Sequence, residues 1–125
     1  EGNMVSISGQ LPFINGKTMF VGRLGETMDL QEGQNAAKNC ALNILAQLNA
    51  ALDGDFTKLA KCLKIGGFVN AVPDFTDHAQ VMNGASDLIG NVLGDKGRHT
   101  RFAVGVSSLP FGVAVEVDAL FLLKS

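Results

Sequence analysis

Two stretches of this chain carry apolar residues at helical spacing, and stretches in which apolar and polar residues alternate lie around them. The helical stretches run from about Leu30 to Leu52 and from about Thr76 or Asp77 to Leu93. Apolar residues three and four positions apart form one stripe on a helix, which must be covered by another element. The pattern predicts an α+β fold in which both helices pack on the same face of a sheet or on adjacent parts of it.

Local signals define the ends of these helices. Asp29 followed by Glu32 is typical of an N-terminal capping box, and Gly33 offers an alternative start. Asp53-Gly54 predicts the end of the first helix, because glycine readily takes the left-handed conformation found there. Gly94 predicts the end of the second helix in the same way.

The alternating stretches are predicted strands, at residues 4–8, 18–21, 59–69, 101–106 and 113–123. The predicted order is therefore ββ-α-β-α-ββ. Asn15-Gly16 predicts a two-residue hairpin turn, and Gly66-Gly67 a bulge or a close approach of another element. Strict alternation in the stretch 59–69 would place two sets of side chains on opposite faces: Leu59, Lys61, Leu63 and Ile65 on one, and Ala60, Cys62 and Lys64 on the other.

Size and charge narrow the class of protein. A chain of 125 residues is expected to form one domain, 1–125, and burial at a subunit interface would help so small a core. The net charge of -2 disfavours nucleic-acid binding, because a basic surface is what attracts phosphates. The sequence contains no run of 18 apolar residues, so no membrane span is predicted. No signal peptide is recognisable at the start. We expect a cytoplasmic protein with reduced cysteines.

Two charged residues near the C-terminus are candidates for chemistry. Glu116 lies in a strongly apolar predicted strand, either as an exposed carboxylate beside Asp118 or as a cleft carboxylate with a raised pKa. Arg101 opens the preceding strand, either as a solvated loop end or as a guanidinium fork for a carboxylate. Their separation within one chain is open at this point. His78 and His99 lack metal-ligand spacing, so no metal is predicted.

Three motifs resemble the RidA/YjgF family. They are Ser8-Gly9-Gln10-Leu11-Pro12, Val81-Met82-Asn83, and the C-terminal pattern Arg101-x-x-Val104-x-Val106-x-x-Leu109-Pro110 followed by Val115-Glu116-Val117. Together they extend over nearly the whole chain, and the C-terminal pattern is fairly specific. Ala103 stands where the family often has cysteine, so the resemblance is to a divergent subgroup.

The resemblance implies a fold, an assembly and an activity. The fold would be chorismate-mutase-like, a mixed β-sheet with two helices on one face, assembled as a barrel-like homotrimer with clefts between subunits. The activity would be hydrolysis of reactive 2-imino (enamino) acids to 2-keto acids and ammonia, without a cofactor. Arg101 would hold the carboxylate of a small-molecule substrate and Glu116 would orient water. Ser8, Gly9, Asn83 and Ala103 would line the pocket.

Two alternatives remain beside this hypothesis. The first is a non-catalytic or differently specific trimer that binds small carboxylates in the same clefts. The second is an RNA-directed or ribosome-directed inhibitor, which the acidic pI of about 5.5 and the low aromatic content of 6% disfavour.

Overall fold

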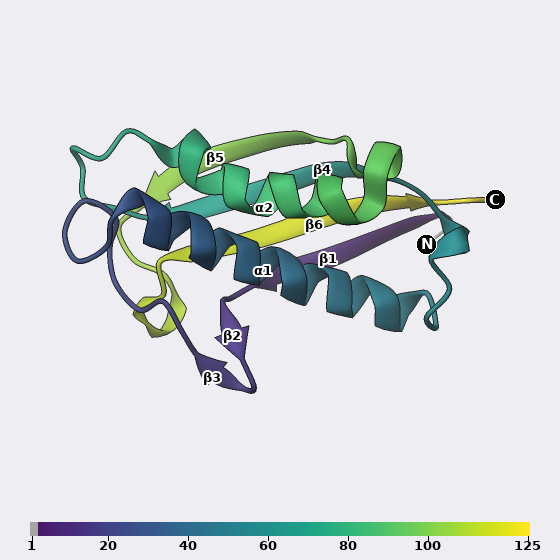
Figure 1. Cartoon of the computed structure of the whole chain (residues 1–125), viewed down its shortest axis with the longest axis horizontal. Helices are drawn as coiled ribbons and strands as arrows, with labels where there is room; N and C mark the ends of the chain where they lie inside the picture. Colours follow the sequence, from purple (N-terminus) through teal and green to yellow (C-terminus); the bar gives the residue numbers. More distant parts are fainter. Residues whose placement is uncertain (1–2) are drawn as a thin grey trace.

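A four-stranded mixed sheet forms one layer of the computed structural model, which describes residues 3–125. Its strands are β1 (Met4–Gln10), β4 (Leu59–Asn70), β5 (Thr100–Val106) and β6 (Val115–Leu123), in the order β1-β6-β4-β5 (Figure 1). β6 is antiparallel to both of its neighbours, whereas β4 and β5 are parallel. The strands β5 and β6 are therefore not hairpin neighbours, because β4 lies between them.

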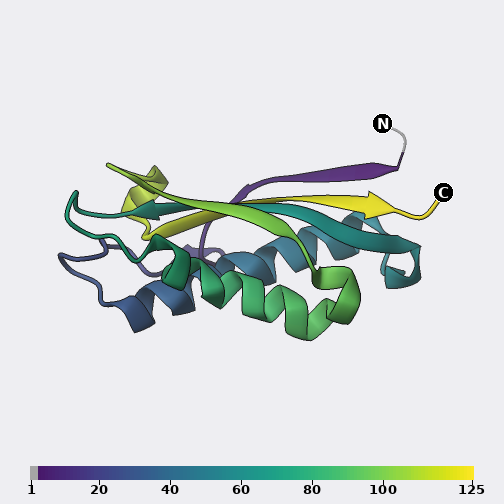
Figure 2. The ribbon, with the colours of Figure 1, turned by 90° about the horizontal axis from the view of Figure 1, so that it is seen from above.

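Two helices form the second layer, and both lie on the same face of the sheet (Figure 2). They are α1 (Leu30–Ala51) and α2 (His78–Leu93), close to the predicted bounds. The capping box is confirmed, with the Glu32 amide donating to Asp29 Oδ1 over 2.8 Å and the Asp29 amide donating to Glu32 Oε1 over 3.1 Å. Gly54 (φ 78°) and Gly94 (φ 63°) follow the two helices with the positive φ that glycine favours, but the ψ of Gly94 is -136°, so Gly94 lies outside the left-handed helical region that was expected.

The short elements include one correct and one wrong prediction. Asn15 (φ 52°) and Gly16 (φ 76°) form the expected turn between β2 (Phe13–Ile14) and β3 (Lys17–Thr18). The predicted strand 18–21 is wrong beyond Thr18, since Phe20 has a φ of 56° and extended pairing cannot continue through it. Three 3₁₀ turns complete the described chain, η1 (Phe56–Lys58), η2 (Gly94–Gly97) and η3 (Pro110–Gly112).

The strand β4 does not alternate as predicted. Its register against β6 shifts twice, between Leu59 and Lys61 and between Cys62 and Lys64. Each extra residue turns the following side chains to the other face, so the buried residues in the first seven positions of β4 are Leu59, Cys62 and Ile65, three positions apart. The close approach at Gly67 is confirmed, because a Cβ there would lie 2.6 Å from Met82 Cγ of α2.

The hydrophobic core lies between the helices and the sheet. β6 contributes alternate residues to it, and the helices contribute most of their apolar residues, including Cys40, whereas Val92 of α2 is 56% exposed. In β6 these inward residues are Val115, Val117, Ala119 and Phe121, all buried. The residues between them, among them Glu116 and Asp118, therefore lie on the opposite, open face of the sheet.

No helix covers this open face in the described chain (Figure 2). It carries aromatic side chains, with Phe68 and Phe102 packed edge to face at 5.4 Å and Lys64 lying 5.5 Å from the Phe102 ring centre. Val104 on the same face is 43% exposed. Parallel strands are usually covered on both faces, so this surface has the character of an interface. No described helix is long and apolar enough to span a membrane.

Candidate functional site

Arg101 lies on the edge strand β5 with its side chain on the helix face of the sheet. Its Nη1 donates to Ser86 Oγ over 3.0 Å and its Nη2 donates to the Ala79 carbonyl over 2.9 Å, so α2 holds the guanidinium at two points. Among residues 3–125, no carboxylate oxygen lies within 4.0 Å of it. The result is a positioned, half-buried cation whose charge is not neutralised by a carboxylate of the described chain.

A chain of hydrogen bonds continues from Arg101 through its serine partner. Ser86 Oγ lies 2.9 Å from His99 Nε2, and His99 Nδ1 lies 2.6 Å from the Gly97 carbonyl oxygen. A carbonyl can only accept, so the Nδ1 of His99 carries the hydrogen. In the tautomer that carries its hydrogen only on Nδ1, Nε2 accepts from the Ser86 hydroxyl, which in turn accepts from Arg101. The Ser86 hydroxyl, the His99 ring N–H and two of the guanidinium N–H groups each have an acceptor, which favours one orientation of the guanidinium.

Two more of the predicted pocket residues lie beside Arg101. Asn83 is exposed and shares one side of α2 with Ala79 and Ser86, because these positions recur at four and three residues. Ala103 lies two residues beyond Arg101 and so on the same face of β5. We call this set, Asn83, Ser86, Arg101 and Ala103, the arginine half-site.

Glu116 lies on the open face of β6, next to Gly9 of the neighbouring strand β1. A Cβ built on Gly9 would overlap Glu116 Oε2 and lie 2.8 Å from its Cδ, so the Glu116 carboxylate in this position packs directly against the Gly9 backbone and would have to move if Gly9 carried a side chain. The register of β1 shifts between Ile7 and Gln10, so Ser8 and Gly9 form an irregular step beside Glu116. We call Ser8, Gly9 and Glu116 the glutamate half-site.

The surroundings of Glu116 favour its protonated form. Partial burial raises the pKa of the Glu116 carboxyl, and the neighbouring carboxylate of Asp118 raises it further. Both effects make ionisation of the Glu116 carboxyl less favourable. A raised pKa makes a carboxylate a better proton acceptor, which is the property that a general base needs.

The structure does not bring Arg101 and Glu116 together within one chain. Glu116 pairs with Phe68 of β4, and Phe68 pairs with Val104 of β5, so these three form one row across the open face. Arg101 lies on the other face of β5, three residues from Val104. The sequence pattern identified both residues, but it could not predict that they lie on opposite faces of the sheet.

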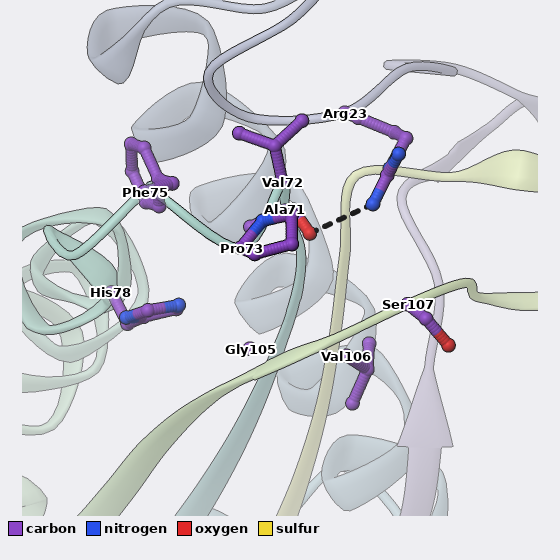
Figure 3. Close-up of a pocket in the computed structure, with 9 residues that line it drawn as sticks. All are labelled: Arg23, Ala71, Val72, Pro73, Phe75, His78, Gly105, Val106 and Ser107. Atoms are coloured by element: carbon purple, nitrogen blue, oxygen red, sulfur yellow. Dashed lines mark hydrogen bonds between the residues drawn. The ribbon is translucent and has the colours of Figure 1, made fainter.

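A cavity of about 360 Å³ lies near the arginine half-site, and the sequence did not predict it (Figure 3). Its walls include Arg23, Phe75, His78, Gly105 and Ser107. Arg23 reaches it from a loop whose glycine spacing matches no phosphate-binding motif, so no sequence signal marked this arginine.

Buried backbone and side-chain groups fix Arg23 in this cavity. Its Nε donates to Asn70 Oδ1 over 3.2 Å and its Nη2 to the Ala71 carbonyl over 2.9 Å. Asn70 is only 3% exposed and donates to the carbonyls of Gly22 and Val113. Within residues 3–125, no cluster of three or more His, Cys, Asp or Glu side chains is arranged to hold a metal ion.

Known proteins with similar sequences and structures come from several organisms. Protein TCP17 of Trypanosoma cruzi is 48% identical over 126 residues, covering 100% of this chain and 78% of TCP17. The structure of Atu1372 from Agrobacterium tumefaciens, a protein of unknown function, is 48% identical with a TM-score of 0.97, covering 99% of this chain and 78% of that one. Escherichia coli TdcF with bound serine is 22% identical with a TM-score of 0.64, covering 99% and 83%, and shows likeness of fold.

A family model matches residues 1–121, and its description is "YjgF/chorismate mutase-like, putative endoribonuclease". The match includes the arginine and glutamate half-sites and the three motifs identified in the sequence. The two helices on a mixed sheet agree with the fold that the resemblance implied. The chain belongs to the YjgF/chorismate mutase-like family.

Proposed function

We propose that this protein hydrolyses 2-imino acids to 2-keto acids and ammonia in clefts between copies of the chain. Arg101 carries the proposal, because its guanidinium is held by α2 and has no carboxylate partner among residues 3–125. A rigid, unpaired guanidinium binds a substrate carboxylate through two hydrogen bonds. TdcF, a relative of the same fold, binds serine, a small molecule that carries a carboxylate.

The reaction needs little beyond positioning. The imine carbon is electrophilic, and a carboxylate held by Arg101 fixes it in the cleft. Glu116 accepts a proton from water as the water oxygen bonds to this carbon. That proton passes to nitrogen to give a carbinolamine. The remaining hydroxyl proton then also moves to nitrogen, the carbon–nitrogen bond breaks, and ammonia leaves as the 2-keto acid forms. The raised pKa of Glu116 suits it to take and return this proton.

Assembly is a necessary part of the proposal. Arg101 and Glu116 lie on opposite faces of the sheet, so one substrate can contact both only if they come from two copies. The exposed aromatic face, with Phe68, Phe102 and Val104, offers the apolar surface that such contacts bury. We propose a homotrimer, which closes this head-to-tail contact into a ring.

The test couples this protein to a threonine dehydratase and follows release of 2-oxobutanoate and ammonia. The protein is expected to accelerate the last step, and Arg101→Ala to abolish the acceleration while light scattering shows an unchanged oligomer. Arg101→Lys is the matched variant, since it keeps the charge and loses the fork, and we expect a large loss there too. An intact oligomer with no acceleration over buffer would refute the deaminase proposal.

The same variants separate the second candidate, a trimer that binds small carboxylates without catalysis. The serine bound to TdcF favours this candidate, because serine contains no imine. Binding of 2-oxobutanoate that depends on Arg101, together with no turnover, would select it. A monomeric mass in solution at micromolar concentration would count against both candidates.

A further inference from the structure

The cavity around Arg23 lies on the same face of β5 as the arginine half-site and further along the strand. Gly105, which lines the cavity, is two residues beyond Ala103. His78 covers Gly105, since a Cβ built there would lie 2.5 Å from His78 Nε2. The neighbouring residue of α2, Ala79, provides the carbonyl that holds Arg101. One continuous edge of α2 and β5 therefore connects the two places.

The distance between the arginine half-site and the cavity suits a single small molecule. Met82 packs over Gly67, whose partner on β5 is Ala103, and His78 packs over Gly105. The interval between these two levels is two strand residues, about 7 Å. Nη2 of Arg101 bonds to the carbonyl of Ala79, and the residue before Ala79, His78, lines the cavity, so a ligand held by Arg101 lies next to the residue that faces the cavity.

The cavity has the charge of an anion site. Its lining includes the guanidinium of Arg23 and the imidazole of His78, and no acidic residue of the described chain. The carboxylate nearest to Arg23 is that of Glu26, at 3.9 Å and 55% exposed, which is a weak surface pair. In Figure 3 the Arg23 and His78 side chains approach the cavity from opposite sides. Val72, Pro73 and Phe75 form an apolar wall between them.

We propose that this cavity binds the distal carboxylate of a dicarboxylic 2-imino acid whose proximal carboxylate is held by Arg101. The inference rests on the proposed function and assigns it a substrate class. Arg23 and His78 contact the distal carboxylate, and the apolar wall packs on the connecting methylenes. Water adds to the imine carbon, the carbon–nitrogen bond breaks, and a 2-keto diacid and ammonia are released.

His78→Glu is the decisive variant. His78 is the first residue of α2, where an acidic side chain is favourable to the helix, so the fold should persist. The new carboxylate repels an anion in the cavity. Gln80→Glu is the matched control, because it introduces the same carboxylate at an exposed position of the same helical turn, outside the cavity lining.

The assay compares two imines, those of glutamate and of 2-aminobutyrate, each generated in situ by an amino-acid oxidase. We expect His78→Glu to lower kcat/KM for the glutamate imine at least tenfold relative to the 2-aminobutyrate imine. Gln80→Glu should change this ratio less than twofold. Equal ratios in the two variants would overturn the inference and leave the deaminase proposal intact.

A binding measurement keeps the inference testable if neither imine is hydrolysed. Calorimetry with 2-oxoglutarate and 2-oxobutanoate reports the subsite without catalysis. A tenfold loss in His78→Glu that is confined to 2-oxoglutarate supports the subsite, even where the deaminase proposal has failed. Equal affinities of the two variants for 2-oxoglutarate overturn it. Arg23→Gln should show the same selective loss, provided that its circular dichroism matches the parent protein.

Discussion

Replacing Gly84 with alanine tests the helix contact that positions the arginine half-site. Gly84 lies on α2 where it crosses α1, and a Cβ there would overlap the Gln34 carbonyl oxygen and lie 2.8 Å from its carbonyl carbon. These are backbone atoms, so no side-chain rotation relieves the overlap. The two helices must separate instead, and Ser86, one half-turn further along α2, must move away from Arg101.

The expected change in the free energy of unfolding of Gly84→Ala follows from two opposing effects. Alanine is favoured over glycine inside a helix by about 1 kcal/mol. Overpacking costs about 1–3 kcal/mol, and the upper end applies because the obstacle is backbone. The net loss for Gly84→Ala is therefore about 2 kcal/mol. For a chain of 125 residues this lowers the Tm by roughly 8 °C.

Gly90 provides the matched control on the same helix, because a Cβ there meets no atom within 4 Å. Gly90→Ala should gain the helix propensity alone and raise the Tm by about 4 °C. Thermal unfolding followed by circular dichroism at one fixed protein concentration compares the two variants. A Gly84→Ala protein as stable as Gly90→Ala would refute the close contact between the helices.

Other predictions concern the half-sites and the cysteines. Asp118→Asn removes a charge that raises the pKa of Glu116, so the acid limb of the pH–rate profile should move to lower pH. Because the pKa of the Glu116 carboxyl is raised in the folded protein, the contribution of this group to stability is present at low pH and is lost as pH rises through that pKa. The Tm of Glu116→Gln should therefore be higher than that of the parent protein at pH 8, and equal to it at pH 4. Ser86→Ala removes one bond to Arg101 and should weaken 2-oxobutanoate binding about fivefold in a calorimetric titration, with kcat less affected. Burial raises the pKa of the Cys62 thiol to about 11 and raises that of Cys40 as well, so neither should react with a thiol reagent at pH 8 until the protein is unfolded in urea.

Much of the fold could be predicted from local sequence signals. Helical spacing identified α1 and α2, and the capping box at Asp29 located the start of α1, because these signals act over one turn. The two register shifts in β4 escaped prediction, since a bulge depends on the partner strand. The parallel pairing of β4 with β5 escaped it for the same reason.

Some residues of the candidate site could also be predicted from the sequence, and others could not. The spacing of the C-terminal motif identified Arg101 and Glu116, but the face that each side chain takes depends on the strand between them. Arg23 was missed because the residues that fix it, Asn70 and Ala71, are distant in the sequence. Only the folded chain brings that arginine to the cavity beside His78.

The location of Arg101 and Glu116 on opposite faces of the sheet has a genetic consequence. If each cleft takes its arginine from one copy and its glutamate from the next, chains carrying Arg101→Ala and Glu116→Gln are each inactive alone and can complement each other. In equal, randomly assembled mixtures, roughly a quarter of the clefts in a closed ring would regain both native side chains. Co-expression of two dead alleles should then restore part of the activity, and a doubly substituted chain should restore none.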